Sequence, residues 1–319
     1  MPLLEIKNLQ LAFGAGEELL HAVDGVSFVL NEGETVCLVG ESGCGKSVTA
    51  LSIARLVATP PANYIGGEIL LNGQDTLKMS ARELQKIRGG VVSYVFQEPG
   101  ASLNPVFRVG SQIKESLELH RPAAATDDEV IRLLKLVGIP APESRIKDYP
   151  HQMSGGMQQR IMIAMALASE PKLLIADEPT TALDVTIQAQ IIELLLELKG
   201  RLGMSILLIT HNLGIVGDIA DRVAVMYAGQ IVELAPASQL LTRPLHPYTQ
   251  ALMNSVPKLG GNAARLTAIG GNVPNLGAFP GGCRFHPRCP KAQPDCSEKP
   301  PELVEVEPGR WVRCPYWKE

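Results

Sequence analysis

Residues 40–47 read GESGCGKS. This stretch fits the phosphate-loop pattern G-x-x-x-x-G-K-[ST] at every fixed position. The apolar run 35–39 before it predicts a buried strand, and residues 48–57 after it predict the start of a helix. Strand, glycine-rich turn and helix in this order predict a loop whose backbone N–H groups face an anion at a helix N-terminus. A chance glycine-rich turn is the alternative.

Individual loop positions have expected roles toward a nucleoside triphosphate. Lys46 would reach the β- and γ-phosphates, and the Ser47 hydroxyl would ligate Mg²⁺. Cys44 lies near the helix N-terminus, which would lower the pKa of its thiol. The predicted phosphate-binding residues are Gly40, Ser42, Gly43, Cys44, Gly45, Lys46, Ser47 and Val48.

The chain as a whole has the composition of a globular protein. Its 319 residues allow one large domain and a smaller one. The formal net charge of −4 leaves no basic excess, which argues against nucleic acid as the main partner. The N-terminus has no apolar signal segment, and runs such as 206–209 are too short to span a bilayer. We expect a cytoplasmic protein that reaches a membrane only through a partner.

Two strands, residues 3–11 and 22–30, are predicted before the loop. As an early antiparallel sheet they could carry Phe13 over the nucleotide base as a stacking platform. Phe13 as an ordinary core residue is an equal alternative.

Carboxylates end a strand in the middle of the chain. The apolar run 173–176 leads directly into Asp177 and Glu178. Asp177 is placed to hold Mg²⁺, directly or through water, and Glu178 to polarise a water for attack on the γ-phosphate. A solvated turn is the alternative for an isolated Asp-Glu pair.

Two further polar residues follow predicted strands. Gln97 follows the strand 91–96 and could bridge Mg²⁺ or the attacking water to a loop, although its position alone favours a solvent-facing side chain. His211 follows the strand 205–210, on the edge where Asp177 and Gln97 are expected. That edge is where ligands bind in open α/β sheets.

A helical segment interrupts the α/β pattern between residues 99 and 149. After it, Ser154, Gly155 and Gly156 stand at the start of a predicted helix. The same physics that favours anions at the first loop makes this a second anion site, with a simple N-cap as the alternative. Asp184 lies in the turn before the helix predicted at 187–198.

The order of these motifs resembles the nucleotide-binding subunit of an ATP-binding cassette (ABC) transporter. The resemblance implies an α/β fold of the P-loop NTPase class. Its parts would be a RecA-like parallel-sheet core, an antiparallel β subdomain and a helical signature subdomain at about residues 99–165. The nucleotide-binding domain would cover residues 1–235, and a small cysteine-containing extension would cover 236–319.

The resemblance also implies a division of roles. Mg-ATP would be bound by Lys46, Ser47 and Asp177, with Gln97 linking the site to the membrane subunit. Glu178 would be the catalytic base, and His211 would stabilise the γ-phosphate. In the family's head-to-tail dimer, the partner's ATP would be contacted by Ser154, Gly155, Gly156 and Asp184.

Departures from the family pattern narrow the choice of branch. Met157 stands where the signature usually has glutamine, and Asn212 follows His211 where aspartate is usual. Ser-Gly-Gly-Met, HPYT at 246–249 and GGCRFHPRCP at 281–290 resemble dipeptide and oligopeptide importers, most similar to the dipeptide type. Nickel and glutathione importers share this extension, so they stay alternatives.

The other cysteines lie close together near the C-terminus: Cys283, Cys289, Cys296 and Cys314. Four thiolates can ligate a [4Fe–4S] cluster or Zn²⁺, and the spacing favours neither; free thiols are a third possibility. The resembled branch can carry a [4Fe–4S] cluster here, so the resemblance favours iron–sulfur. The extension contains little apolar sequence, and we expect it to need the metal to fold.

The sequence therefore predicts an ATPase that powers peptide import, with ATP, Mg²⁺ and a [4Fe–4S] cluster (or Zn²⁺) as cofactors. It would sit on the cytoplasmic face of the cell (inner) membrane. Its expected partners are a second cassette, a paralogue rather than another copy, two permease subunits and an external peptide-binding protein. A soluble ABC ATPase acting on ribosomes or DNA, and an exporter subunit, are the rivals.

Overall fold

In a computed structural model, which describes residues 2–14, 16, 19–181, 183–255 and 269–318, the chain forms two compact units. The first unit holds residues 1–31, 35–78 and 209–319. The second holds residues 32–34 and 79–208. Both units contain strands and helices, as an α/β chain requires. The domain boundaries expected at 99–165 and 235 stay a prediction.

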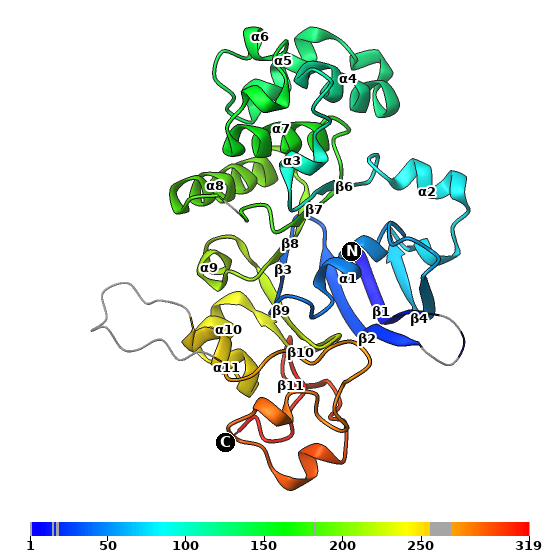
Figure 1. Ribbon diagram of the computed structural model, residues 1–319, viewed down its shortest axis with the longest axis vertical. Helices are drawn as coiled ribbons and strands as arrows, with labels where there is room; N and C mark the ends of the chain where they lie inside the picture. Colours follow the sequence, from blue (N-terminus) through cyan, green and yellow to red (C-terminus); the bar gives the residue numbers. More distant parts are fainter. Residues whose placement is uncertain (1, 15, 17–18, 182, 256–268, 319) are drawn as a thin grey trace. The chain divides into compact units, whose positions relative to one another are not determined.

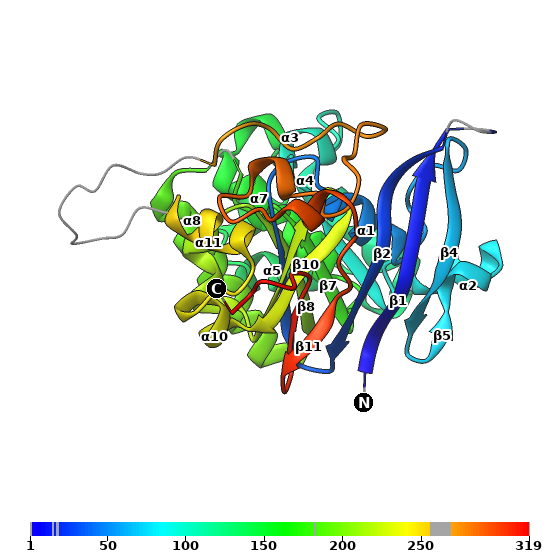
Figure 2. The same cartoon turned by 90° about the horizontal axis from the view of Figure 1, so that it is seen from below.

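An antiparallel sheet of four strands belongs to the first unit (Figure 2). β1 (Pro2–Phe13) lies between β2 (Leu20–Asn31) and β4 (Ala62–Leu71), and β5 (Gln74–Asp75) pairs with β4. Leu9 and Leu11 of β1 are fully buried, so apolar side chains hold this sheet to the core. Phe13, the last residue of β1, is half-buried, and its stacking on a base stays a prediction.

A second set of strands in the first unit mixes parallel and antiparallel pairing. β3 (Thr35–Val39), buried along its whole length, runs parallel to β9 (Arg222–Tyr227). β10 (Gln230–Pro236) is antiparallel to β9, and it pairs on its other side with β12 (Arg310–Val312). β11 (Val304–Glu307) pairs in turn with β12. The C-terminal segment, whose described residues are 237–255 and 269–318, thus extends the sheet that carries the phosphate loop.

Helices and single turns complete the first unit. Its α-helices are α1 (Lys46–Ser52), α9 (Val216–Ile219), α10 (Ala237–Thr242) and α11 (Pro247–Asn254). Its 3₁₀ turns are η1 (Thr76–Lys78), η4 (Leu213–Ile215), η5 (His286–Arg288) and η6 (Pro294–Ser297). α1 begins at Lys46, within the loop motif and two residues before the predicted start, and it ends at Ser52.

In the second unit, parallel strands meet a group of helices. β6 (Val92–Val95) pairs in parallel with β7 (Leu173–Asp177), and the unit ends within β8 (Ser205–Thr210). α2 (Ala81–Ile87) starts at a capping box in which Ser80 and Glu83 bond each other's backbone N–H groups. The remaining elements are α3 (Pro99–Ser102), α4 (Val109–His120), η2 (Pro122–Ala124), α5 (Asp127–Leu136), α6 (Pro142–Arg145), η3 (Pro150–Gln152), α7 (Gly155–Leu167) and α8 (Val185–Leu202).

α7 is the helix around which the others gather. α3, α4 and α5 all contact it (Figure 1). Its buried side chains include Ile161 and Ile163, which are fully covered. In the part of the chain that the structure describes, no helix has the length and apolar character needed to cross a bilayer.

Candidate nucleotide-binding site

The glycines of the phosphate loop are required by close packing within the chain. A Cβ on Gly40 would lie 2.2 Å from the Met226 carbonyl oxygen, and one on Gly45 would lie 2.7 Å from the Ala22 carbonyl oxygen. No side chain fits at either distance. From the sequence alone, we attributed these glycines to the close approach of the loop backbone to an anion. The structure adds that the loop rests directly against the end of β9 and against β2.

Lys46 is drawn back onto the loop that precedes it. Its side chain is buried, and its ammonium donates to the carbonyl oxygens of Gly40 at 2.8 Å and Glu41 at 2.9 Å. Thr49, one turn further along α1, donates to the Gly45 carbonyl at 2.9 Å. These bonds close the loop around the N-terminus of α1 and place the lysine charge beside the loop backbone.

Cys44 differs from its prediction. The residue is fully buried, and desolvation raises the pKa of its thiol even though the Lys46 ammonium acts in the opposite direction. The predicted lowering by the helix N-terminus is therefore wrong, because burial outweighs the nearby positive charge. Cys44 is a neutral thiol packed beneath the loop.

The ends of β6 and β7 bring Gln97 to Glu178. The parallel register pairs Val95 with Ala176, so the residues that follow the two strands are neighbours. The Gln97 amide donates to Oε2 of Glu178 at 3.1 Å, and the Thr181 hydroxyl donates to the same oxygen at 2.9 Å. Glu178 has φ of 48°, a left-handed conformation that is unusual outside glycine. Sequence reasoning named Gln97 and Glu178 but gave Thr181 no role.

The signature residues start α7. Ser154 is its N-cap, and its hydroxyl accepts from the Met157 N–H at 3.4 Å. Ser154 and Gly155 are exposed, whereas a Cβ on Gly156 would lie 3.0 Å from Cγ2 of Ile187 in α8. The two glycines therefore differ in their surroundings. Gly155 faces solvent, whereas Gly156 lets α7 and α8 approach each other closely.

Asp184 and Asn212 are both caps. The Asp184 carboxylate accepts from the Ile187 N–H at 2.9 Å and starts α8. The Asn212 side chain accepts from the Gly214 N–H at 2.9 Å, which is the bond that an aspartate at this place could also make. The exposed His211 therefore precedes a turn whose cap is intact despite the departure from the family pattern.

The comparisons with known proteins agree with this geometry. Residues 23–181 match the family model described as ABC transporter, and residues 232–296 match the one described as oligopeptide/dipeptide transporter, C-terminal region. The oligopeptide transport ATP-binding protein AppD of Bacillus subtilis is 50% identical over 319 residues, covering 99% of this chain and 97% of that protein. The chain belongs to the ABC transporter family of ATP-binding proteins.

Other relatives point the same way. The dipeptide transport ATP-binding protein DppD of Bacillus subtilis is 48% identical. The alignment covers 97% of this chain and 91% of DppD. The solved dimeric structure of the ATP-binding cassette MJ0796 with ADP and Pi is 28% identical at a TM-score of 0.65, covering 73% of this chain and 98% of the other. The α/β cassette fold expected from the sequence is thereby confirmed.

As a member of this family, the ABC protein is an ATPase that uses ATP with Mg²⁺. Its chain offers the hard oxygen donors that Mg²⁺ prefers, namely the Ser47 hydroxyl and the Asp177 carboxylate. These donors fit the ion. The individual binding residues stay predictions.

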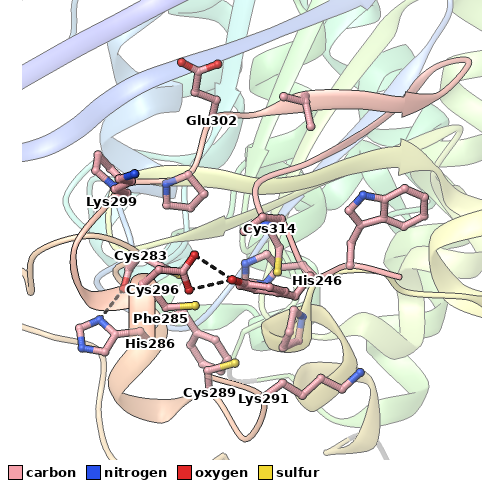
Figure 3. A pocket seen from close by; sticks show the side chains of 18 residues that line it. His246, Cys283, Phe285, His286, Cys289, Lys291, Cys296, Lys299, Glu302 and Cys314 are labelled. Atoms are coloured by element: carbon pink, nitrogen blue, oxygen red, sulfur yellow. Dashed lines mark hydrogen bonds between the residues drawn. The ribbon is translucent and has the colours of Figure 1, made fainter. Parts of the chain in front are cut away.

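The iron–sulfur prediction is wrong. Figure 3 shows Cys283, Cys289, Cys296 and Cys314 among the residues that line one pocket. Within the described residues, however, no group of three or more His, Cys, Asp or Glu side chains is arranged to hold a metal ion. Burial raises the pKa of Cys283, Cys289 and Cys314, the last to about 11. For Zn²⁺, the alternative ion, the described part of the chain likewise holds no such group of side chains.

The C-terminal segment has another source of order. Its strand β12 pairs with β10, and the Phe285 ring packs against those of Tyr227 and Tyr248, 5.3 Å from each. All three rings are buried. The expectation that a metal folds this segment overlooked these contacts, because they lie with residues distant in the sequence.

Proposed function

We propose that the protein couples ATP binding and hydrolysis to the import of dipeptides or oligopeptides. The observation that carries this proposal is the match of residues 232–296 to the oligopeptide/dipeptide C-terminal region behind an ABC cassette. AppD and DppD, which carry oligopeptide and dipeptide transport in their names, align over nearly the whole chain.

In this proposal, ATP is held by the loop and by strand-end residues. Lys46 binds the β- and γ-phosphates, Ser47 and Asp177 hold Mg²⁺ with Gln97, and His211 contacts the γ-phosphate. Glu178 accepts a proton from the attacking water. The double hydrogen bond from Gln97 and Thr181 supports this role, because it holds the carboxylate in one orientation.

A second cassette supplies the rest of each ATP site. The exposure of Ser154 and Gly155 supports this, since a helix start with accessible N–H groups can bind the phosphates of a partner's nucleotide. Asp184, also exposed, would act across the same interface. The second cassette is a paralogue in this proposal.

Two permease subunits receive the motion on the cytoplasmic face of the membrane, and an external protein delivers the peptide. Large apolar side chains stand exposed in the segment that contains Gln97: Phe96 at 42%, Phe107 at 54% and Val106 at 71%. Exposed apolar side chains such as the adjacent Val106 and Phe107 are typical of a contact surface. They support docking of a permease beside Gln97.

A pull-down of tagged Glu178→Gln protein with ATP tests the proposal. The variant keeps the shape of Glu178 but cannot accept the proton, so it should accumulate the closed ATP-bound dimer. From detergent-solubilised membranes we expect two permeases and a second, different cassette. A Lys46→Ala variant carried through in parallel should retain none of them in an ATP-dependent manner.

Other partners would overturn the proposal. Recovery of ribosomes or DNA-repair proteins without any membrane protein would favour the soluble rival. The substrate is identified by comparing the uptake of a labelled dipeptide between cells that contain the protein and cells that lack it. Loss of nickel or glutathione uptake with normal peptide uptake would contradict the peptide assignment.

A further inference from the structure

Glu41, the second residue of the phosphate loop, is held by the C-terminal segment. Its carboxylate accepts two hydrogen bonds from Arg288, Nη1 to Oε2 at 2.6 Å and Nη2 to Oε1 at 2.9 Å. Its backbone N–H donates to the Tyr248 hydroxyl at 3.0 Å. Both the side chain and the backbone of one loop residue are therefore fixed by residues more than two hundred positions away.

Arg288 is itself immobilised. Its side chain is 7% exposed, and its Nε donates to the Gly270 carbonyl at 2.8 Å. Its guanidinium lies over the Tyr227 ring, 5.7 Å from the ring centre. Because Nε, Nη1 and Nη2 of the guanidinium all donate hydrogen bonds, the planar group is held in one orientation. The position of Arg288 thus dictates that of the Glu41 carboxylate.

Tyr248 is fixed as firmly. It is fully buried in α11, and its ring lies 4.6 Å from that of Tyr227 and 5.3 Å from that of Phe285. Its hydroxyl is the atom that reaches the loop. A buried N–H without an acceptor is costly, so this contact constrains the loop backbone at Glu41.

The same loop residue contacts the lysine. The Glu41 carbonyl oxygen accepts from the Lys46 ammonium at 2.9 Å. A continuous path of hydrogen bonds therefore runs from Arg288 and Tyr248 through Glu41 to the side chain assigned to the phosphates. The cassette MJ0796 aligns with only 73% of this chain.

We propose that Tyr248 and Arg288 are positioning residues that hold the phosphate loop, through Glu41, in the shape that binds nucleotide. The inference rests on the proposed function of the loop in binding ATP. It gives the C-terminal segment a part in nucleotide affinity, in addition to any part in transport. A pre-shaped loop pays less conformational entropy when phosphates bind.

Tyr248→Phe tests the contact at one atom. The variant keeps the ring in its aromatic cluster and removes only the hydroxyl. Binding of a non-hydrolysable ATP analogue with Mg²⁺ is measured by calorimetry on the full chain, well below the unfolding temperature. We expect the dissociation constant to rise roughly 2- to 10-fold, as for loss of a single hydrogen bond.

Tyr316→Phe is the matched control. The Tyr316 hydroxyl donates to the Asp295 carboxylate, at 2.8 and 2.7 Å to its two oxygens, in the same C-terminal segment. A merely structural role of tyrosine hydroxyls would lower the unfolding temperature of both variants and leave the affinity of the folded protein unchanged. A positioning role changes affinity in Tyr248→Phe alone.

Glu41→Gln and Arg288→Lys provide an independent test that does not depend on Tyr248. Both variants break the bidentate pair and should weaken binding by at least about 3-fold, because charge-assisted pairs are stronger than neutral ones. Because they remove one shared contact, the double variant should bind about as weakly as the worse single variant. Additive losses would contradict a shared path.

The inference and the proposed function fail differently. If the wild-type chain does not bind the analogue more tightly than Lys46→Ala, the loop is not a nucleotide site and both fail. If the wild type binds, yet Tyr248→Phe and Glu41→Gln bind within 2-fold of it, the positioning inference alone is overturned.

Discussion

The side-chain amide of Gln97 donates to Oε2 of Glu178 at 3.1 Å, and so ties the end of β6 to the end of β7. Thr181 donates to the same oxygen at 2.9 Å. A residue expected to link the ATP site to a permease is thus in direct contact with the expected catalytic base. A displacement of the Gln97 loop would change the orientation of that base without any intervening residue.

Removing the Thr181 hydroxyl should slow hydrolysis. Thr181→Val keeps the shape of the side chain but deprives Glu178 of one donor, so the carboxylate is held less firmly. We expect kcat for ATP to fall by about 3- to 10-fold, below the 10²–10⁴-fold typical of losing a general base outright. Steady-state phosphate release measures it. Thr181→Ser, which retains the hydroxyl, should stay near the wild type, and equal losses in both variants would contradict the role of the hydrogen bond.

Two glycines of the loop should differ sharply in their tolerance of alanine. A Cβ at Gly40 would lie 2.2 Å from the Met226 carbonyl, whereas one at Gly43 would meet nothing within 4 Å. We expect Gly40→Ala to lower the free energy of unfolding by at least about 3 kcal/mol through overpacking. Gly43→Ala should cost only about 1–2 kcal/mol, for a positive φ of 78°. Urea denaturation compares the two, and equal costs would show that the close approach is absent.

His246 should make the protein less stable in acid. Burial lowers the pKa of His246 from 6.5 to about 3, and its Nδ1 accepts from the Tyr248 N–H at 3.0 Å. Between these two pKa values the unfolded chain binds a proton that the folded protein does not, so the free energy of unfolding falls as pH decreases from 6.5 toward 3. The slope from this residue is at most about 1.4 kcal/mol per pH unit.

Urea melts of the wild type and of His246→Asn across this window check the effect. Asparagine can cap α11 in the same way but does not titrate. The variant should show the smaller slope. Burial raises the pKa of Glu233, which the backbone N–H of His246 contacts, and this acts with the opposite sign. The difference between the two proteins isolates the histidine, and identical slopes would contradict its buried, neutral state.

The buried pair of Arg310 and Glu233 should matter more for stability than surface pairs. Their side chains are 1% and 0% exposed, with the charged atoms 3.5 Å apart, and Glu233 also accepts from the Leu245 N–H at 2.9 Å. Arg310→Met leaves a buried carboxylate without its partner and should cost about 3–5 kcal/mol. Arg243, at 62% exposure, provides the control. Arg243→Met should cost under about 1 kcal/mol in the same denaturation experiment.

Local patterns predicted much of the fold. The strand β8 covers the predicted residues 205–210, and β6 lies within the predicted strand 91–96. The parallel strands also predict that Gln97 and Asp177 lie on one edge of a sheet, since strand ends carry the ligands in such folds. These features depend on neighbours in the sequence or on general topology.

Contacts between distant segments could not be predicted. β12 has only three residues, too few to show an alternating pattern, and its pairing with β10 joins residues far apart in the chain. The contact of Arg288 with Glu41 and the burial of Cys44 arise in the same way. Four clustered cysteines and the family resemblance suggested a metal, whereas the segment's stabilising partners lie far away in the sequence.

The late position of β12 has a consequence for the synthesis of the chain. β10 leaves the ribosome with one edge open, and the strand that covers it is made only after α10, α11 and the cysteine segment. An open strand edge is a template for pairing with other chains. Newly made molecules therefore pass through a stage that is prone to aggregation, and the two glutamates on β11, Glu305 and Glu307, protect the outer edge once the sheet is complete.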